Sequence, residues 1–147
     1  MKNKKTLKAY SKIELGEFSN LTESIFQPNP DFKLVGKKFI KDELGLSSAE
    51  ISFNTMAANT AVPFLHKHQE NEEIYIAIKG KGQLLLNDSY VAMEEGTIVR
   101  VATDTERAIR NNSNEPFTFI VIQAKENSLK GSTISDGYGI EKKPNWN

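Results

Sequence analysis

The sequence contains no cysteine, only two histidines and one tryptophan, and no excess charge of either sign. Without cysteine there is no disulfide, thiolate zinc site, iron–sulfur cluster or cysteine nucleophile, so any metal must bind histidine, carboxylate, carbonyl or water. The 19 Lys and Arg residues balance 19 Asp and Glu residues, which removes the basic character that nucleic-acid or anionic-lipid binding normally needs. We expect no nucleic-acid partner.

Long apolar runs are also lacking, so no segment of the sequence is expected to cross a membrane. The lysines near the N-terminus are not followed by the apolar stretch of a secretory signal. These two absences predict a cytoplasmic protein that does not bind membranes.

The length of 147 residues predicts a single domain, residues 1–147. A chain of this size buries about two thirds of the surface exposed when it is unfolded, so it needs no metal merely to hold together. Any metal would therefore be functional. We expect a core barrel over about residues 35–124, an irregular N-terminal arm over residues 1–34 and a tail over residues 125–147.

Short β-branched and aromatic segments separated by turn residues follow residue 48, a rhythm that predicts an all-β sandwich or barrel with antiparallel strands. Gly80–Gly82 and Asn87–Asp88 are expected to form hairpin turns. Trp146 is expected to dock on the barrel or on a partner subunit. The predicted strands span residues 49–56, 62–68, 72–79, 83–86, 89–93, 97–102, 107–111 and 116–124.

Both histidines fall in one short stretch as His66-Lys-His68, and an acidic residue, Glu73, opens the next predicted strand. Residues two apart in a strand point to the same face, which would place the two imidazoles together. By the same alternation Glu73 shares a face with Tyr75 and Ala77. Two imidazoles and a carboxylate suit iron, manganese, nickel or zinc with positions left open for substrate. Spacing alone leaves a solvent-facing pair of histidines about equally acceptable.

The stretch resembles the first motif of the cupin superfamily, which reads H-x-H, three or four residues, E, six residues and G. His66, His68, Glu73 and Gly80 stand at these positions, while Thr60 replaces the glycine that opens the motif. The resemblance implies a small single-domain bacterial cupin of the conserved-barrel type, an all-β double-stranded β-helix or jelly roll. It also implies that the two histidines and the glutamate are ligands of a divalent transition metal.

The second cupin motif, aligned by its ends, is a variant in this sequence. Gly96 and Asn111 match it, but Ala102 and Asp104 replace its proline and second glycine, and Arg107 replaces the histidine that is the fourth metal ligand in most members. A guanidinium has no lone pair to give a metal.

Two functional arrangements of Arg107 remain open. A purely structural ion pair at the barrel rim is a further alternative. In the first, the metal stays on the three-residue site and Arg107 binds an anionic substrate through its fork of donors. In the second, the arginine takes the place of the metal, pairs with Glu73 and leaves a metal-free polar pocket. We place the three-ligand metal site slightly ahead, because the motif spacing of both histidines and Glu73 would otherwise be unexplained.

Tyr75 and Gln123 are further substrate-binding candidates, although Tyr75 could equally fill the core and Gln123 could simply end a strand. We expect a small-molecule-binding cupin that acts, if it is an enzyme, as an isomerase, dioxygenase or lyase on a small polar or anionic substrate in the barrel mouth. The alternative is a metal-free, non-catalytic ligand- or sugar-binding cupin; a purely structural role fits least well. Homodimer formation is expected by analogy with small cupins, with the N-terminal segment supplying an edge strand.

Overall fold

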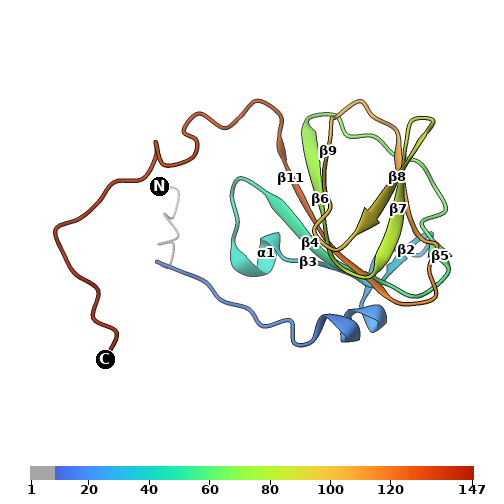
Figure 1. Ribbon diagram of the computed structural model, residues 1–147, viewed down its shortest axis with the longest axis horizontal. Coiled ribbons are helices and arrows are strands. Elements are labelled where there is room, and N and C mark those ends of the chain that lie inside the picture. Colours follow the sequence, from blue (N-terminus) through green and yellow to red (C-terminus); the bar gives the residue numbers. More distant parts are fainter. Residues whose placement is uncertain (1–8) are drawn as a thin grey trace.

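The computed structural model describes residues 9–147 and shows two antiparallel sheets packed face to face (Figure 1). One sheet has the strand order β3-β4-β11-β6-β9 and the other the order β5-β10-β7-β8. Every strand pair is antiparallel, as the sequence predicts. The strands of the two sheets are β3 (Lys37–Phe39), β4 (Glu50–Met56), β5 (Thr60–Ala61), β6 (Asn71–Lys79), β7 (Lys81–Leu86), β8 (Ser89–Glu94), β9 (Ile98–Val101), β10 (Arg107–Asn111) and β11 (Phe117–Lys125).

The core lies between the two sheets and is filled by alternate residues of each strand. Along β6, burial alternates so that Glu73, Tyr75 and Ala77 are buried while their neighbours are only partly covered. This confirms the predicted face of Glu73. Leu84 on β7 and Phe117 on β11 are completely buried, and they close the core from opposite sheets.

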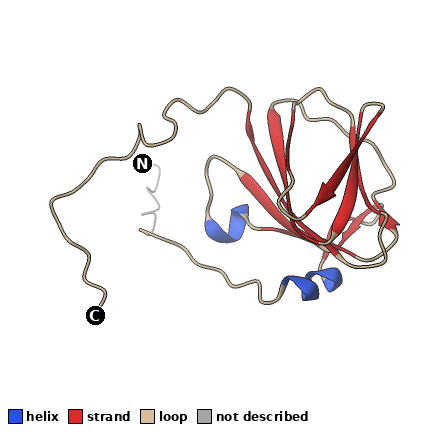
Figure 2. Cartoon of the chain, viewed as in Figure 1, coloured by secondary structure: helices blue, strands red, loops and turns tan. Residues whose placement is uncertain are grey.

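A separate hairpin precedes the barrel and is formed by β1 (Ile25–Asn29) and β2 (Phe32–Val35), after a 3₁₀ helix, η1 (Phe18–Glu23). A second short helix, α1 (Lys41–Leu44), follows β3, and both helices lie outside the sheets (Figure 2). Gly36 joins β2 to β3 with φ +81, and a Cβ there would overlap the carbonyl oxygen of Thr55. Glycine is therefore required at the turn that delivers Lys37 to the inner face of β3.

Seven of the eight predicted strands are present with small shifts of their ends, but the strand predicted over residues 62–68 is wrong. The strand β5 ends just before it at Ala61, Pro63 has no N–H to continue the pairing, and residues 62–68 contain only an isolated bridge at His66. The segment still runs beside β10, because the backbone N–H of Val62 donates to Ile109 and that of His66 donates to Arg107. The extended course that the histidine alternation needs is therefore kept.

Gly80 forms a corner between the sheets, and the predicted hairpin at Gly80–Gly82 is wrong. Strands β6 and β7 belong to different sheets, and the backbone of Gly80 turns with φ +83 against the carbonyl of Pro116. The predicted hairpin at Asn87–Asp88 is confirmed, since Leu86 pairs with Ser89 across it.

Residues after β11 leave the barrel as an extended tail (Figure 1). Trp146 is 91% exposed, so the predicted docking of its ring on the barrel is wrong. The tail runs away from the barrel to the C-terminus, so the ring does not reach the apolar residues of the sheets (Figure 1). Across residues 9–147, no helix is long and apolar enough to cross a membrane, and the cytoplasmic location stays a prediction.

Candidate metal centre and ligand cavity

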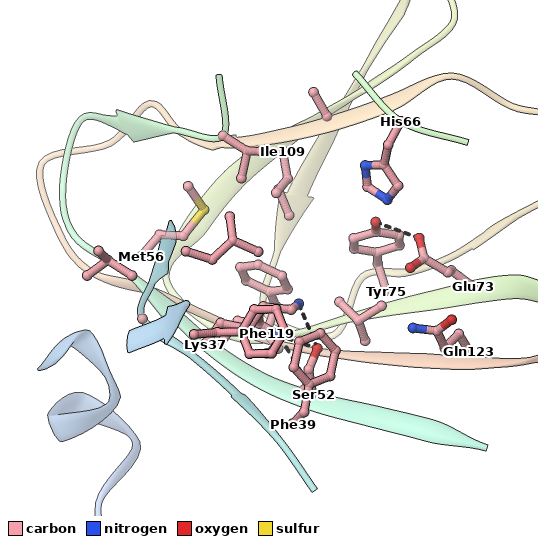
Figure 3. Close-up of a pocket in the computed structure, with 18 of the residues that line it drawn as sticks. Lys37, Phe39, Ser52, Met56, His66, Glu73, Tyr75, Ile109, Phe119 and Gln123 are labelled. Carbon is pink, nitrogen blue, oxygen red and sulfur yellow. Dashed lines mark hydrogen bonds between the residues drawn. The ribbon is translucent and has the colours of Figure 1, made fainter. Parts of the chain in front are cut away.

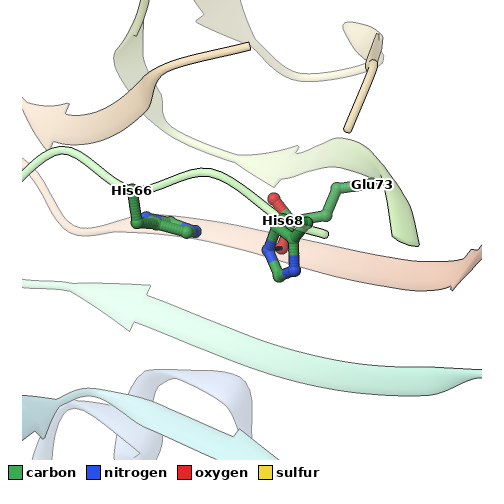
Figure 4. Close-up of side chains that lie close together, drawn as sticks. All are labelled: His66, His68 and Glu73. Carbon is green, nitrogen blue, oxygen red and sulfur yellow. Dashed lines mark ion pairs between the residues drawn. The ribbon is translucent and has the colours of Figure 1, made fainter. Parts of the chain in front are cut away.

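His66, His68 and Glu73 come together at one end of the barrel, with a donor atom of each lying within 4.8 Å of the others (Figure 4). The histidines lie on the segment between β5 and β6, and the glutamate lies near the start of β6. Two backbone hydrogen bonds between His66 and Arg107, of 3.1 and 3.0 Å, fix this segment against β10. The imidazole rings lie 5.2 Å apart between centroids, so the predicted convergence of the two histidines is present.

Two ring nitrogens of this cluster are buried without a hydrogen-bond partner among the residues that the structure describes: His66 Nδ1 and His68 Nε2. His68 Nε2 lies 3.0 Å from Glu73 Oε1, yet the angles are not those of a hydrogen bond. Two ligands at right angles around an ion, each at about 2.1 Å, would be about 3.0 Å apart. The donor set and its orphaned nitrogens therefore fit a divalent metal.

Glu73 is held by its second carboxylate oxygen. Oε2 accepts hydrogen bonds from Tyr75 Oη at 2.8 Å and from Arg107 Nη1 at 2.9 Å. Burial alone would raise the pKa of Glu73, but the Tyr75 hydrogen bond and the neighbouring His68 and Arg107 lower it below its usual value. The carboxylate is thus ionised and oriented, with Oε1 left to face the histidines.

The pKa of His66 is lowered mainly by burial, and the positive charges of Arg107 and Lys37 lower it further against the opposing effect of Glu73. Burial and the charge of Glu73 raise the pKa of Tyr75, which stays a phenol that can donate. A metal ligand must be a neutral imidazole with a free lone pair. The environment of His66 favours that form.

Arg107 lies elsewhere than expected for a substrate-binding residue, because it is completely buried and does not line the cavity. Besides its ion pair with Glu73, its Nη2 donates to the carbonyls of Ala102 at 2.7 Å, Thr103 at 3.0 Å and Thr105 at 3.0 Å. Its pairing with Glu73 is that of the second arrangement considered above, in which the arginine takes the place of the metal. Each histidine nevertheless keeps a ring nitrogen without a hydrogen-bond partner in residues 9–147. The loop after β9 thus supplies the carbonyls that this arginine needs.

A cavity of about 360 Å³ opens beside the metal cluster, between the inner face of the five-stranded sheet, the β1–β2 hairpin and β10 (Figure 3). Tyr75 and Gln123 both line it, and Gln123 Oε1 accepts a hydrogen bond from Asn71 at 3.0 Å. Most of the lining is apolar, and its phenylalanines are Phe26, Phe32, Phe39, Phe64 and Phe119.

Lys37 is a cavity residue that the sequence reading missed. Its Nζ donates to Ser52 Oγ at 2.9 Å and to Asn54 Oδ1 at 3.0 Å, and lies 4.8 Å from the ring centre of Phe39. Burial lowers its pKa to about 8, although Glu73 and Glu50 oppose the shift. The sequence shows only adjacent lysines after Gly36, and that signal does not say which of them faces inward.

Comparison with known proteins supplies three likenesses. A family model described as a cupin domain matches residues 53–123. A cupin protein of Bacteroides fragilis is 31% identical in sequence, covers 91% of this chain and 99% of its own, and superposes with a TM-score of 0.76. Glucose-6-phosphate isomerases of Thermococcus onnurineus and Pyrococcus horikoshii are 42% and 33% identical over 62 and 76 residues, or 39% and 48% of this chain. The match spans only 33% and 40% of those two proteins.

Proposed function

The chain belongs to the cupin family, and from that premise we propose that it is a metal-dependent cupin that binds a small molecule in its cavity. The observation that carries this proposal is the set of three donor atoms within 4.8 Å of one another, together with one buried ring nitrogen on each histidine that has no hydrogen-bond partner in residues 9–147. An orphaned buried nitrogen is costly unless a ligand or ion satisfies it. The residues proposed to hold the metal are His66, His68 and Glu73.

A divalent transition metal at this position would supply Lewis-acid chemistry to a substrate bound beside it. The protein's own groups orient that site: Tyr75 and Arg107 fix the carboxylate of Glu73, and phenylalanine side chains give the cavity beside it a mostly apolar lining. Isomerase, dioxygenase and lyase reactions are all consistent with this arrangement. The names of the two archaeal relatives favour an isomerase, but the likeness covers less than half of their length.

We expect the purified protein to carry about one divalent transition metal per chain. Elemental analysis of protein purified without chelators measures this, followed by removal with EDTA and titration with Mn²⁺, Fe²⁺, Ni²⁺ and Zn²⁺. Protein that holds no metal after purification and binds none on titration would contradict the proposal. That outcome would favour the metal-free ligand-binding cupin, in which Glu73, paired with the buried Arg107, and the two histidines make the polar end of the pocket.

A homodimer is part of the same proposal. The tail and the N-terminal segment carry large apolar side chains that are more than four-fifths exposed, among them Tyr10, Tyr138 and Trp146. Burial of such side chains in a second copy would remove apolar surface from water. Light scattering at several concentrations should give twice the mass of one chain. The mass of a single chain at every concentration would contradict the dimer.

A further inference from the structure

Lys37 is the only lysine or arginine that lines the cavity within residues 9–147. Its ammonium has three N–H groups, of which two donate to Ser52 and Asn54. Neither side chain carries charge, and no carboxylate of the described chain forms an ion pair with Lys37. One N–H donor and the positive charge of Lys37 therefore remain available to a ligand in the cavity.

The two acceptors of Lys37 are themselves fixed. Asn54 donates through Nδ2 to the carbonyls of Ser52 at 3.1 Å and Phe119 at 3.3 Å, which directs its amide oxygen at the ammonium. Ser52 Oγ accepts from both Lys37 and Asn54, so its own hydroxyl hydrogen stays free to donate. Ser52 and Asn54 are almost completely buried. Two fixed acceptors therefore hold the ammonium in place, and the Ser52 hydroxyl beside it can donate to a ligand.

The charges around the cavity do not balance without a ligand. Glu73 is neutralised by its ion pair with Arg107. Glu50, the other acid that influences Lys37, does not line the cavity, and its Oε1 accepts from the backbone N–H groups of Lys41 and Ile51. A cation held in an apolar site is costly unless it is paired. A ligand with one negative charge would supply the missing partner.

The remainder of the wall restricts the body of that ligand. A chain of ring contacts runs from Phe39 through Phe26 and Phe32 to Phe64, with centroids 4.7, 6.4 and 5.5 Å apart, and ends 6.2 Å from His66. Such a wall offers no hydrogen bonds to the hydroxyl groups of a sugar, and those groups would be buried unpaired. Apolar groups, and flat aromatic ones above all, suit it.

We infer that the cavity binds a small, mainly apolar carboxylate, whose acid group is received by Lys37 and Ser52 and whose body lies along the aromatic wall. The ligand's other end, away from its acid group, would then lie beside the metal cluster (Figure 3). Ser52 is paired through Val121 with Tyr75, two strand spacings away, or about 10 Å. The inference deepens the proposed function by naming a substrate class, and it departs from the sugar phosphate in the names of the archaeal relatives.

Probe acids test this inference: benzoate, phenylacetate and 3-phenylpropionate, each compared with its neutral amide, and glucose 6-phosphate. Calorimetric titration is done on EDTA-treated protein and again after metal loading. In wild-type protein at pH 7 we expect at least one acid to bind tenfold or more tightly than its amide and more tightly than glucose 6-phosphate. No binding of any acid, or equal binding of acid and amide, would overturn the inference.

The variant Lys37→Met keeps the length of the side chain and removes its charge; because it also removes a donor to Ser52 and Asn54, circular dichroism and thermal melts check that it is folded. It should lose tenfold or more in affinity for the acid and less than twofold for the amide. Lys38→Met is the matched control, because Lys38 is the next residue of β3 and pairs instead with Glu43; it should bind like the wild type. Equal losses for acid and amide in Lys37→Met would overturn the role of the charge.

The two proposals fail in different ways. Protein that binds no metal but keeps the Lys37-dependent preference for acids would contradict the metal site and leave the carboxylate site standing. Protein that binds metal but prefers glucose 6-phosphate to every acid would leave the metal site standing and overturn the carboxylate inference.

Discussion

Replacing His66 with alanine is expected to lower the affinity of the EDTA-treated protein for Mn²⁺ or Zn²⁺ by at least about a hundredfold. The loss of groups that merely orient a ligand typically costs 10- to 100-fold in metal affinity, so the loss of a ligand should reach or exceed that range. His68→Ala should behave in the same way, because its Nε2 is the second buried nitrogen without a partner in the described chain. Calorimetric titration of each variant measures the effect.

Tyr75→Phe is the informative control for these variants. It keeps all three donors and removes only the 2.8 Å hydrogen bond to Glu73 Oε2, so the expected loss is about tenfold. Circular dichroism and thermal melts show whether each variant is folded. A His66→Ala protein that is folded and binds metal as tightly as wild type would contradict the assignment of His66 as a ligand.

The metal cluster could be predicted from the sequence because its geometry is mostly local. His66 and His68 are two residues apart on an extended segment, and Glu73 lies on the buried face of the next strand. Even with the strand over 62–68 wrongly assigned, backbone hydrogen bonds from Val62 and His66 to β10 keep the segment beside that strand. Residue spacing therefore predicted that the three side chains converge, whereas the resemblance to the cupin motif was needed to interpret them as metal ligands.

Lys37 could not be found in the same way. Its function in the cavity depends on the pairing of β3 with β4, which brings it to Asn54 and Ser52, 17 and 15 residues away. The sequence before residue 45 has no alternation strong enough to set that register. The face of a three-residue strand is set by its partner, so the tertiary structure alone distinguishes Lys37 from Lys38.

The position of Arg107 was anticipated in one respect and missed in another. Its pairing with Glu73 was one of two arrangements left open by the variant motif, whereas its burial was not foreseen. Burial depends on how the carbonyls of residues 102–105 converge on the guanidinium, a property of the loop conformation that no spacing reveals.

The variant Arg107→Met should therefore lower the stability of the folded protein more than it changes ligand binding. It leaves the buried carboxylate of Glu73 without its cation and the carbonyls of three loop residues without a donor. Breaking one side of a buried ion pair typically costs about 3–5 kcal/mol, so the free energy of unfolding in urea should fall by about that amount. A large fraction of the stability of a domain of this size would be lost.

Arg110→Met is the matched control, because Arg110 lies on the same strand but is exposed, donates to Gln83 and lies over the Tyr90 ring. Its removal should cost about 1 kcal/mol or less. In the double variant Arg107→Met with Glu73→Gln, part of the loss should return, since the carboxylate is no longer charged. An Arg107→Met protein of wild-type stability that has lost only its affinity for anionic ligands would contradict the structural role and return Arg107 to the substrate-binding position first expected for it.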